Sequence, residues 1–255
     1  MISVGEVKQL VRHHRCTCHD QDPQDCPFWS LVSAYVTESV GLDLHELALI
    51  DGISDDVFLR HNQALYSALF RAGRCTYIVD SSKSLSRFRK LLRASRSGAD
   101  FDLIPVHLRR GAFGTLNSAH RKERDLKAPI YSYCKDYFKS REVLQDIDYV
   151  EVCYEKLARN PRRELSRIMQ EIGLVFEDSQ LQWRNAVVRD VGGNRMRRGS
   201  SNVIRLDQAW RRELTLALKI RIFIQTLPVR LRSRFLFKLW RSWLKPVKGT
   251  PKLSS

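Results

Sequence analysis

The sequence predicts an α/β fold with a parallel, doubly wound sheet. Short apolar runs rich in β-branched and aromatic residues alternate with longer segments whose apolar residues recur at helical spacing. Parallel strands need a long crossover connection, which is usually a helix, so this alternation is typical of a sheet covered by helices. The expected strands are 76–80, 101–108 and 148–153.

The expected helices lie before, between and after these strands. In one of them, Leu85, Phe88 and Leu91 fall on the same face at helical spacing. In another, Pro161 stands in the first turn, where proline is tolerated. The expected helices are 28–40, 57–72, 84–94, 112–123, 127–145 and 161–172. Segment 216–224 alternates like a strand but follows a helical pattern, so its type stays open.

Size and charge narrow the class of protein. A chain of 255 residues with 43% hydrophobic residues can bury a substantial core, which excludes a mainly disordered protein. The net charge of +16 indicates an anionic partner. Residues 205–248 hold twelve Lys and Arg against two Asp and Glu, so the positive charge is concentrated near the C-terminus. Because these residues lack a recognisable base-reading motif, we expect no nucleic-acid partner.

Three of the six cysteines, Cys16, Cys18 and Cys26, stand close together, with three histidines among residues 13–19. Cysteines and histidines so close together suggest a zinc site. Structural zinc sites, however, favour gaps of two to four residues within each ligand pair, so a C-x-C pair fits poorly. We therefore expect no metal, and reduced cysteines or a local disulfide instead. Cys75 and Cys153 lie in apolar runs, where a thiol behaves as a small hydrophobe, and this usage indicates a reducing compartment.

Two expected strands end in cationic side chains. The first runs into a short polar turn that ends at Lys83, and the second runs into Arg110 and a glycine-containing turn. Open α/β sheets bind ligands at the carboxyl ends of their strands. Arg110 and Ser118, placed at the strand end and on the early turns of the next helix, would suit a phosphate. The alternative is a solvated pair of arginines.

Several short motifs occur together in a recognisable order. They are Cys16-x-Cys18, Cys26-Pro27-Phe28-Trp29, Val79-Asp80-Ser81-Ser82-Lys83, Leu108-x-Arg110 with Ser118, Tyr154-Glu155-Lys156-Leu157 with Pro161, and Gly193-Asn194 with Asp207 and Trp210. In this order the sequence resembles the bacterial branch of the sulfotransferases, up to about residue 215. The resemblance implies a P-loop-NTPase-like three-layer fold and the sulfuryl donor 3′-phosphoadenosine 5′-phosphosulfate (PAPS), a chemistry that needs no metal.

The resemblance also implies a domain that is truncated at its N-terminus. In that family a strand and a Gly/Ser-rich loop, whose N–H groups and hydroxyls hold the 5′-phosphosulfate, precede the motifs found here. Residues 1–6 look like the family segment downstream of that loop. We therefore expect a truncated sulfotransferase-like domain over 1–212 and a basic extension over 213–255.

Individual donor-binding roles follow from the same resemblance. Arg110 and Ser118 match the residues that bind the 3′-phosphate of the donor. Arg195 and Arg198 lie in a segment that closes over the donor phosphates in related enzymes, the alternative being a solvated basic loop. At 111–113 this sequence has Gly-Ala-Phe where the family usually has an Asp, a small residue and an Arg, which removes an ion pair and a cation.

Two further residues match catalytic positions. Glu6 resembles the acid that several carbohydrate sulfotransferases use as a base, and Lys83 would neutralise the transferring sulfuryl group or hold an anionic acceptor. The alternatives are a surface carboxylate and a lysine that faces water. The expected function is sulfuryl transfer from PAPS to a hydroxyl of a carbohydrate or lipid-linked acceptor. The alternative is an inactive remnant that binds an anionic ligand or a membrane surface.

The C-terminal part contains one amphipathic segment. Residues 229–245 place Leu231, Phe235 and Leu239, with two tryptophans, on one helical face among basic residues. Such a helix suits an anionic membrane surface, and the alternative is a terminal helix packed on the domain. No transmembrane span or signal peptide is visible in the sequence, so we expect a cytoplasmic protein with this segment as its peripheral membrane contact.

Overall fold

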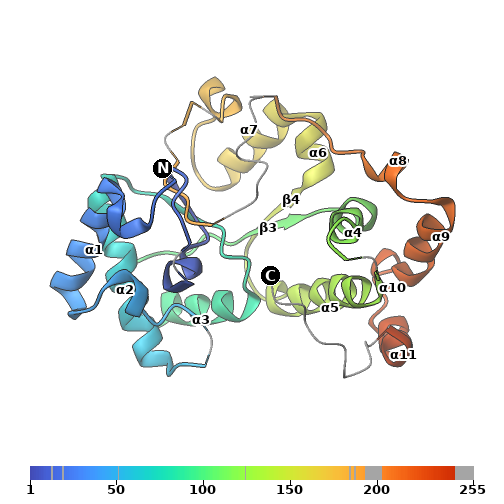
Figure 1. The fold of residues 1–255 in the computed structure, drawn as a ribbon, viewed down its shortest axis with the longest axis horizontal. Helices are drawn as coiled ribbons and strands as arrows, with labels where there is room; N and C mark the ends of the chain where they lie inside the picture. Colours follow the sequence, from blue (N-terminus) through green and yellow to red (C-terminus); the bar gives the residue numbers. More distant parts are fainter. Residues whose placement is uncertain are drawn as a thin grey trace. The chain divides into compact units, whose positions relative to one another are not determined.

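The protein divides into two compact units, each with its own core (Figure 1). The computed structural model describes residues 1–12, 14–18, 20–50, 52–123, 125–183, 185–186, 188–192 and 203–244, without the side chains of 240–244. Unit 1 comprises Met1–Leu103 and Asp178–Val203, and unit 2 comprises Ile104–Glu177 and Ile204–Ser255. Unit 1 is therefore built from two stretches of chain that are distant in sequence.

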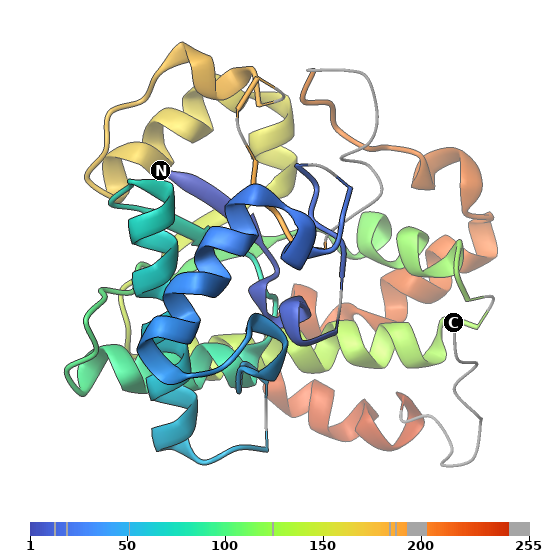
Figure 2. The ribbon, with the colours of Figure 1, turned by 60° about the vertical axis from the view of Figure 1, so that its left-hand side comes forward.

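Unit 1 contains one pair of parallel strands, β1 (Ile2–Gly5) and β2 (Ile78–Asp80). Ile2 lies opposite Ile78 and Ser3 opposite Val79, and the register shifts between Ser3 and Gly5. The helices of unit 1 are η1 (Val7–Arg12), η2 (Pro23–Asp25), α1 (Pro27–Val40), η3 (Leu44–Glu46), α2 (Asp55–Gly73), α3 (Leu85–Arg96) and η4 (Asp178–Leu181). Helices α1 and α2 pack against each other (Figure 2).

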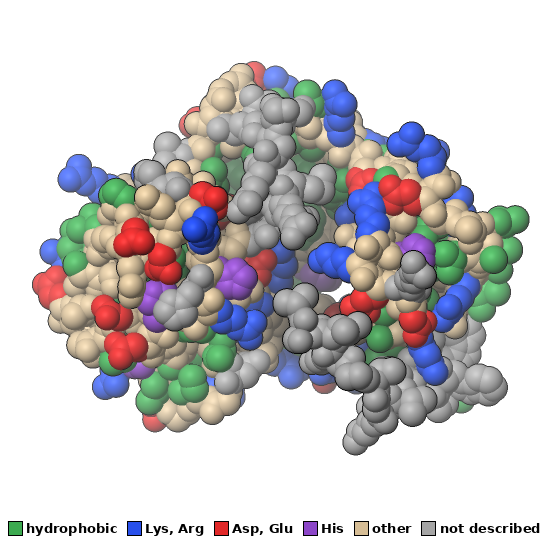
Figure 3. Space-filling view, in the orientation of Figure 1, with side chains coloured by type: hydrophobic (Ala, Val, Ile, Leu, Met, Phe, Trp, Pro, Cys, Tyr) green, Lys and Arg blue, Asp and Glu red, His purple; other side chains and the backbone are tan. Residues whose placement is uncertain are grey.

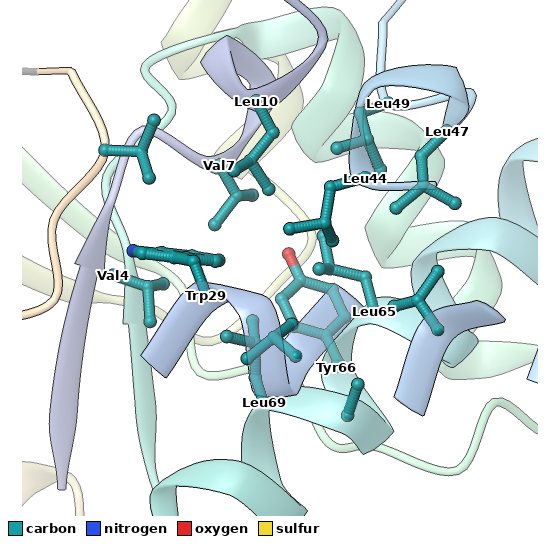
Figure 4. Packing of buried hydrophobic residues seen from close by; sticks show 14 of the residues in the cluster. Val4, Val7, Leu10, Trp29, Leu44, Leu47, Leu49, Leu65, Tyr66 and Leu69 are labelled. Atoms are coloured by element: carbon teal, nitrogen blue, oxygen red, sulfur yellow. The ribbon is translucent and has the colours of Figure 1, made fainter. Parts of the chain in front are cut away.

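The core of unit 1 forms around Trp29 of α1, which is fully buried (Figure 4). Its side chain lies beside Val4 of β1 and above Leu69 of α2. The indole Nε1–H donates a hydrogen bond to the carbonyl oxygen of Arg189 at 3.1 Å, so this buried polar group is satisfied. Strand β1 and residue 189 are thus held by the same side chain.

Residues 189–191 run alongside β1 in the parallel direction. The N–H groups of Arg189 and Val191 donate to the carbonyl oxygens of Ser3 and Val4, each at 3.0 Å. The hydroxyl of Ser3 donates to the buried carboxylate of Asp190 at 2.5 Å, across 187 positions of sequence. Two segments that are far apart in the sequence therefore complete the edge of this small sheet.

Unit 2 contains a second pair of parallel strands, β3 (Val106–Arg109) and β4 (Val150–Cys153). Val106 lies opposite Val150, and Arg109 lies opposite Cys153. The helices of unit 2 are α4 (Ala112–His120), α5 (Lys127–Leu144), α6 (Tyr154–Arg159), α7 (Pro161–Glu171), α8 (Trp210–Glu213), α9 (Leu216–Gln225), α10 (Leu227–Arg230) and α11 (Arg234–Leu244).

The C-terminal helices contribute to the core of unit 2. Ile130, Cys134 and Phe138 of α5 pack with Ile222 of α9 and Phe237 of α11. The rings of Phe138 and Phe237 stack with their centroids 5.0 Å apart. The segment with the largest positive charge is therefore part of a packed unit.

The predicted α/β class and the parallel pairing of strands are confirmed, and all six predicted helices form within a few residues of their predicted bounds. The strands form two separate pairs rather than one doubly wound sheet, and the strand predicted over 101–108 begins only at Val106. Segment 216–224, which the sequence left open, is helical. The prediction of a single helix over 229–245 is wrong, because the chain turns between α10 and α11, where Arg232 has a φ of 53°. Strand β1 and the short helix α6 were not predicted. None of the helices in the described ranges is long and apolar enough to cross a membrane.

Candidate functional site

Glu6 is fixed at the carboxyl end of β1 by a close approach of two backbones. Gly5 has a φ of 69°, and a Cβ at this position would lie 2.7 Å from the carbonyl oxygen of Val191, so only glycine fits. The N–H of Glu6 then donates to that carbonyl oxygen at 2.9 Å. The backbone thus sets the position from which the Glu6 side chain extends.

The structure brings Glu6 and Lys83 together. Lys83 Nζ donates to Glu6 Oε1 at 2.8 Å, and Gln9 Nε2 donates to the other carboxylate oxygen at 3.5 Å. The Glu6 side chain is 13% exposed and that of Lys83 is 67% exposed. Burial would raise the pKa of Glu6, but the hydrogen bond and charge of Lys83, with smaller contributions from Gln9 and Lys8, hold it below its ordinary value. Glu6 is therefore ionised at neutral pH.

A buried network fixes the end of β2, from which Lys83 follows. The carboxylate of Asp80 accepts hydrogen bonds from the Tyr66 hydroxyl at 2.9 Å, from Arg87 Nη2 at 3.2 Å and from the backbone N–H of Ser82 at 2.9 Å. Arg87 is 2% exposed and also donates to the carbonyl oxygen of Leu49 at 3.0 Å. Burial, followed by the charge of Asp80, raises the pKa of Tyr66. Because its members are hydrogen-bonded to one another, this network holds the turn at 81–83 in one conformation.

Unit 1 also contains a cavity of about 220 Å³ with cationic walls. Its lining residues are Lys8, Arg12, Leu49, Ile50, Ser84 and Arg87. Ser84, at the N-terminus of α3, accepts a hydrogen bond from the N–H of Arg87 at 3.3 Å. Lys8, Arg12 and a helix N-terminus make the cavity suitable for a negatively charged group, since the charge of Arg87 is paired with Asp80.

In unit 2, Arg110 follows the last residue of β3, as predicted. Its Nη2 donates to Asp207 Oδ2 at 2.8 Å, and its guanidinium lies 4.7 Å from the centroid of the Tyr154 ring. A Cβ on Gly114 would lie 2.8 Å from the Arg110 Nε, so the glycine lets the guanidinium lie against the first turn of α4. The tyrosine hydroxyl in turn accepts from the N–H of Asp207 at 3.0 Å.

Two carboxylates already accept hydrogen bonds from the Arg110 guanidinium and the Gly111 N–H at the end of β3. Asp207 accepts from the N–H of Ala209, and this bond, followed by Arg110, holds its pKa below the ordinary value despite partial burial. Glu155 Oε1 accepts from the N–H of Gly111, the residue that caps α4, at 2.8 Å. A negative charge is favoured at this helix N-terminus, and an anionic ligand would replace or share these contacts.

Of the remaining predicted donor-binding residues, the structure describes Ser118. Ser118 lies in the second half of α4, and its side chain is exposed. It lies on the second turn of α4, which begins at Ala112 as predicted. Arg195 and Arg198 lie outside the described residues. His107 is half-buried on β3, where burial lowers its pKa, in keeping with a packed histidine.

The sequence did not predict the ion pairs that form between residues far apart in the chain. An example is Glu213, which binds Arg121 through two hydrogen bonds of 2.8 and 2.7 Å and accepts from Asn117 at 2.8 Å. The bonds from Arg121 and Asn117 lower the pKa of Glu213 to about 2. Acidic and basic side chains are interspersed over the face drawn in Figure 3, so part of the net positive charge is balanced locally by such pairs.

Two pairs of parallel strands with cationic residues after the strand ends, among helices, define an α/β protein. No protein-family model and no curated protein matches the chain. Among solved structures it is similar to the sulfotransferase domain from the Synechococcus PCC 7002 olefin synthase. The TM-score is 0.50 at 18% identity, and the similarity covers 90% of this chain and 94% of that domain. The chain therefore has a sulfotransferase-like fold.

Proposed function

We propose that this protein transfers a sulfuryl group from PAPS to a hydroxyl of a carbohydrate or lipid-linked acceptor. The observation that carries the proposal is the sulfotransferase-like fold with Arg110 immediately after β3, its guanidinium positioned by Asp207 and Tyr154. A guanidinium presents donors in a planar fork that matches a phosphate. In this proposal Arg110 and Ser118 bind the 3′-phosphate, and Arg195 and Arg198 contact the donor phosphates.

The transfer needs a proton acceptor and a cation. The acceptor oxygen forms a bond to sulfur, the bond from sulfur to the 5′-phosphate oxygen breaks, and adenosine 3′,5′-bisphosphate leaves. Glu6 takes the hydroxyl proton, for which its ionised state at neutral pH is suited. Lys83 interacts with the negative charge of the sulfuryl group. None of these steps uses a metal ion.

The cationic cavity of unit 1 supports an acceptor that carries a negative charge near its hydroxyl. Lys8 and Arg12 line it, and Ser84 of the cavity wall directly follows Lys83 in the chain. An acidic sugar or a phosphate-bearing lipid head group has this chemistry.

Binding of the desulfated donor tests the proposal. Calorimetric titration with adenosine 3′,5′-bisphosphate is expected to show saturable binding to the chain. Arg110→Ala should weaken binding about 10- to 100-fold, because a hydrogen bond to a charged group contributes about 1.5–3 kcal/mol. Adenosine 5′-monophosphate, which lacks the 3′-phosphate, should bind equally well to both proteins.

The neighbouring Arg109 provides the matched control. It lies on β3 and forms an ion pair with Glu151, so Arg109→Ala should leave nucleotide affinity unchanged. Absence of binding to the wild-type chain at high micromolar concentration would contradict the enzymatic proposal. Tight binding without sulfuryl transfer to any hydroxyl acceptor would favour the alternative of an inactive protein that binds an anion.

A second proposal concerns the apolar face of α11. Phe235 and Leu239 are 69% and 53% exposed, whereas Phe237, on the opposite side of the helix, is buried in unit 2. The amphipathic face predicted from the sequence is therefore not the face that packs on the unit. Arg234 and Lys238 stand beside it and are exposed, so an anionic bilayer complements it in both polarity and charge. We propose that this helix contacts the cytoplasmic membrane surface.

Vesicle sedimentation checks the membrane contact. The chain is expected to pellet with phosphatidylglycerol-containing vesicles at low salt, and less with phosphatidylcholine vesicles. The double variant Phe235→Ser/Leu239→Ser should reduce partitioning about tenfold or more, since each large apolar side chain contributes about 1.5–3 kcal/mol when fully buried. The control is Val175→Ser, which removes an 82% exposed side chain elsewhere in unit 2 and should change nothing. Equal sedimentation of the double variant would refute the contact.

A further inference from the structure

Three cysteine sulfur atoms converge in unit 1. Cys18 Sγ lies 3.3 Å from Cys16 Sγ and 3.1 Å from Cys26 Sγ, and all three atoms lie within 4.8 Å of one another. Cys16 and Cys26 are buried, and Cys18 is partly buried. The six cysteines, all within the described residues, form no disulfide. Two buried thiols and one near the surface thus share one small volume.

Local turns and one tertiary contact create this cluster. Cys16 forms an antiparallel bridge with Val191, and its N–H donates to the carbonyl oxygen of Gln21 at 2.8 Å. Cys26 is the residue before α1, and its N–H donates to the carbonyl oxygen of Pro23 at 3.2 Å. The spacing argument against zinc concerned only the gap within the Cys16-x-Cys18 pair. In the fold, the sulfur of Cys26 lies beside both of these residues.

We infer that Cys16, Cys18 and Cys26 bind one Zn²⁺ ion through three thiolates, with a solvent molecule or a further side chain as the fourth ligand. Thiolates are the preferred ligands of zinc, and zinc–sulfur bonds of about 2.3 Å in tetrahedral geometry place sulfur atoms about 3.8 Å apart. The observed separations of 3.3 and 3.1 Å need to open by about 0.5 and 0.7 Å. The site uses none of the residues Glu6, Lys83 and Arg110, and it does not rest on the proposed sulfuryl transfer.

Ion binding is balanced by proton release. Each thiol that becomes a ligand loses its proton to solvent, so zinc replaces three protons and no electrons are transferred. Affinity should therefore fall as the pH is lowered.

The ion would hold together the parts of unit 1 that position Glu6. Cys16 and Thr17 contact residues 190–191, the N–H of Thr17 donating to the carbonyl oxygen of Asp190 at 2.8 Å. The N–H of Glu6 donates to the carbonyl oxygen of Val191 at 2.9 Å. We expect a structural role, in which removing the ion lowers the melting temperature of the whole chain.

The test measures metal content and a spectroscopic signature on the full chain. Protein purified under reducing conditions without chelator should contain about one zinc per chain. Replacement of zinc by Co²⁺ should produce thiolate-to-cobalt absorption in the near ultraviolet. Cys18→Ser should lose the ion, whereas Cys75→Ser, which changes a cysteine outside the cluster, should retain it.

Three results would overturn the inference. One is reduced wild-type protein that contains no zinc and takes up neither Zn²⁺ nor Co²⁺. Another is a disulfide, detected as a loss of two alkylatable thiols when protein purified without reductant is denatured and alkylated. The third is an unchanged cobalt spectrum in Cys18→Ser. If that variant does not fold, the metal content and cobalt spectrum of the wild-type protein decide the question alone.

Discussion

Arg87→Met is expected to destabilise the protein by about 3–5 kcal/mol, because it leaves the largely buried carboxylate of Asp80 without its cation. Asp80 is 14% exposed and Arg87 only 2% exposed, so water cannot replace the lost contact. The substitution also removes the donors to Tyr66 and Leu49. Urea unfolding followed by tryptophan fluorescence measures the change in the free energy of unfolding.

The same helix provides the control. Arg93 of α3 forms an ion pair with Asp55, but its side chain is 65% exposed, so Arg93→Met should change stability by less than about 0.5 kcal/mol. A loss below about 1 kcal/mol for Arg87→Met would show that the buried network does not hold unit 1 together.

Glu6→Gln is expected to lower the rate of sulfuryl transfer by about 10²–10⁴-fold, the usual contribution of a general base. This prediction rests on the proposed function. Nucleotide binding should stay unchanged, so a normal titration with adenosine 3′,5′-bisphosphate shows that the variant is folded. Glu38→Gln, which changes an exposed glutamate paired with Arg71, is the matched control and should retain full activity.

The pH profile distinguishes a base from a residue that only supports the fold. The pKa of Glu6 lies below its ordinary value of 4.5, so the ionised, proton-accepting form predominates above that pH. Activity limited by this group should be level between about pH 6 and 8 and fall only as the pH drops through the lowered pKa. An unchanged rate in Glu6→Gln would assign the proton to another acceptor.

The fold was predictable where periodicity is strong. Helix α3 is an example, since its leucines and phenylalanine repeat at helical spacing and its N-terminal Ser84 is a good cap. Strand β1 was not predictable, because its pairing depends on β2 and on residues 189–191, which are far away in sequence. The break before α11 depends on a left-handed backbone conformation at Arg232. An arginine in the sequence does not indicate such a conformation.

The candidate site was predictable only as separate residues. Strand–turn patterns placed Lys83 and Arg110 after strand ends, which the structure confirms. The contact between Lys83 and Glu6 spans 77 positions, and that between Arg110 and Asp207 spans 97. Spacing carries no information over such distances.

The pairing of residues 189–191 with β1 also constrains when unit 1 can fold. A ribosome adds about 5–20 residues per second and releases the N-terminus first. The partner of Ser3, Val4 and Glu6 is synthesised only after Ile104–Glu177 has been completed. Strand β1 therefore has one edge unpaired while Ile104–Glu177 is made, so a strand that is synthesised before these residues completes its native contacts only after them. Exposed strand edges are prone to aggregation, and this interval is the vulnerable stage of its biosynthesis.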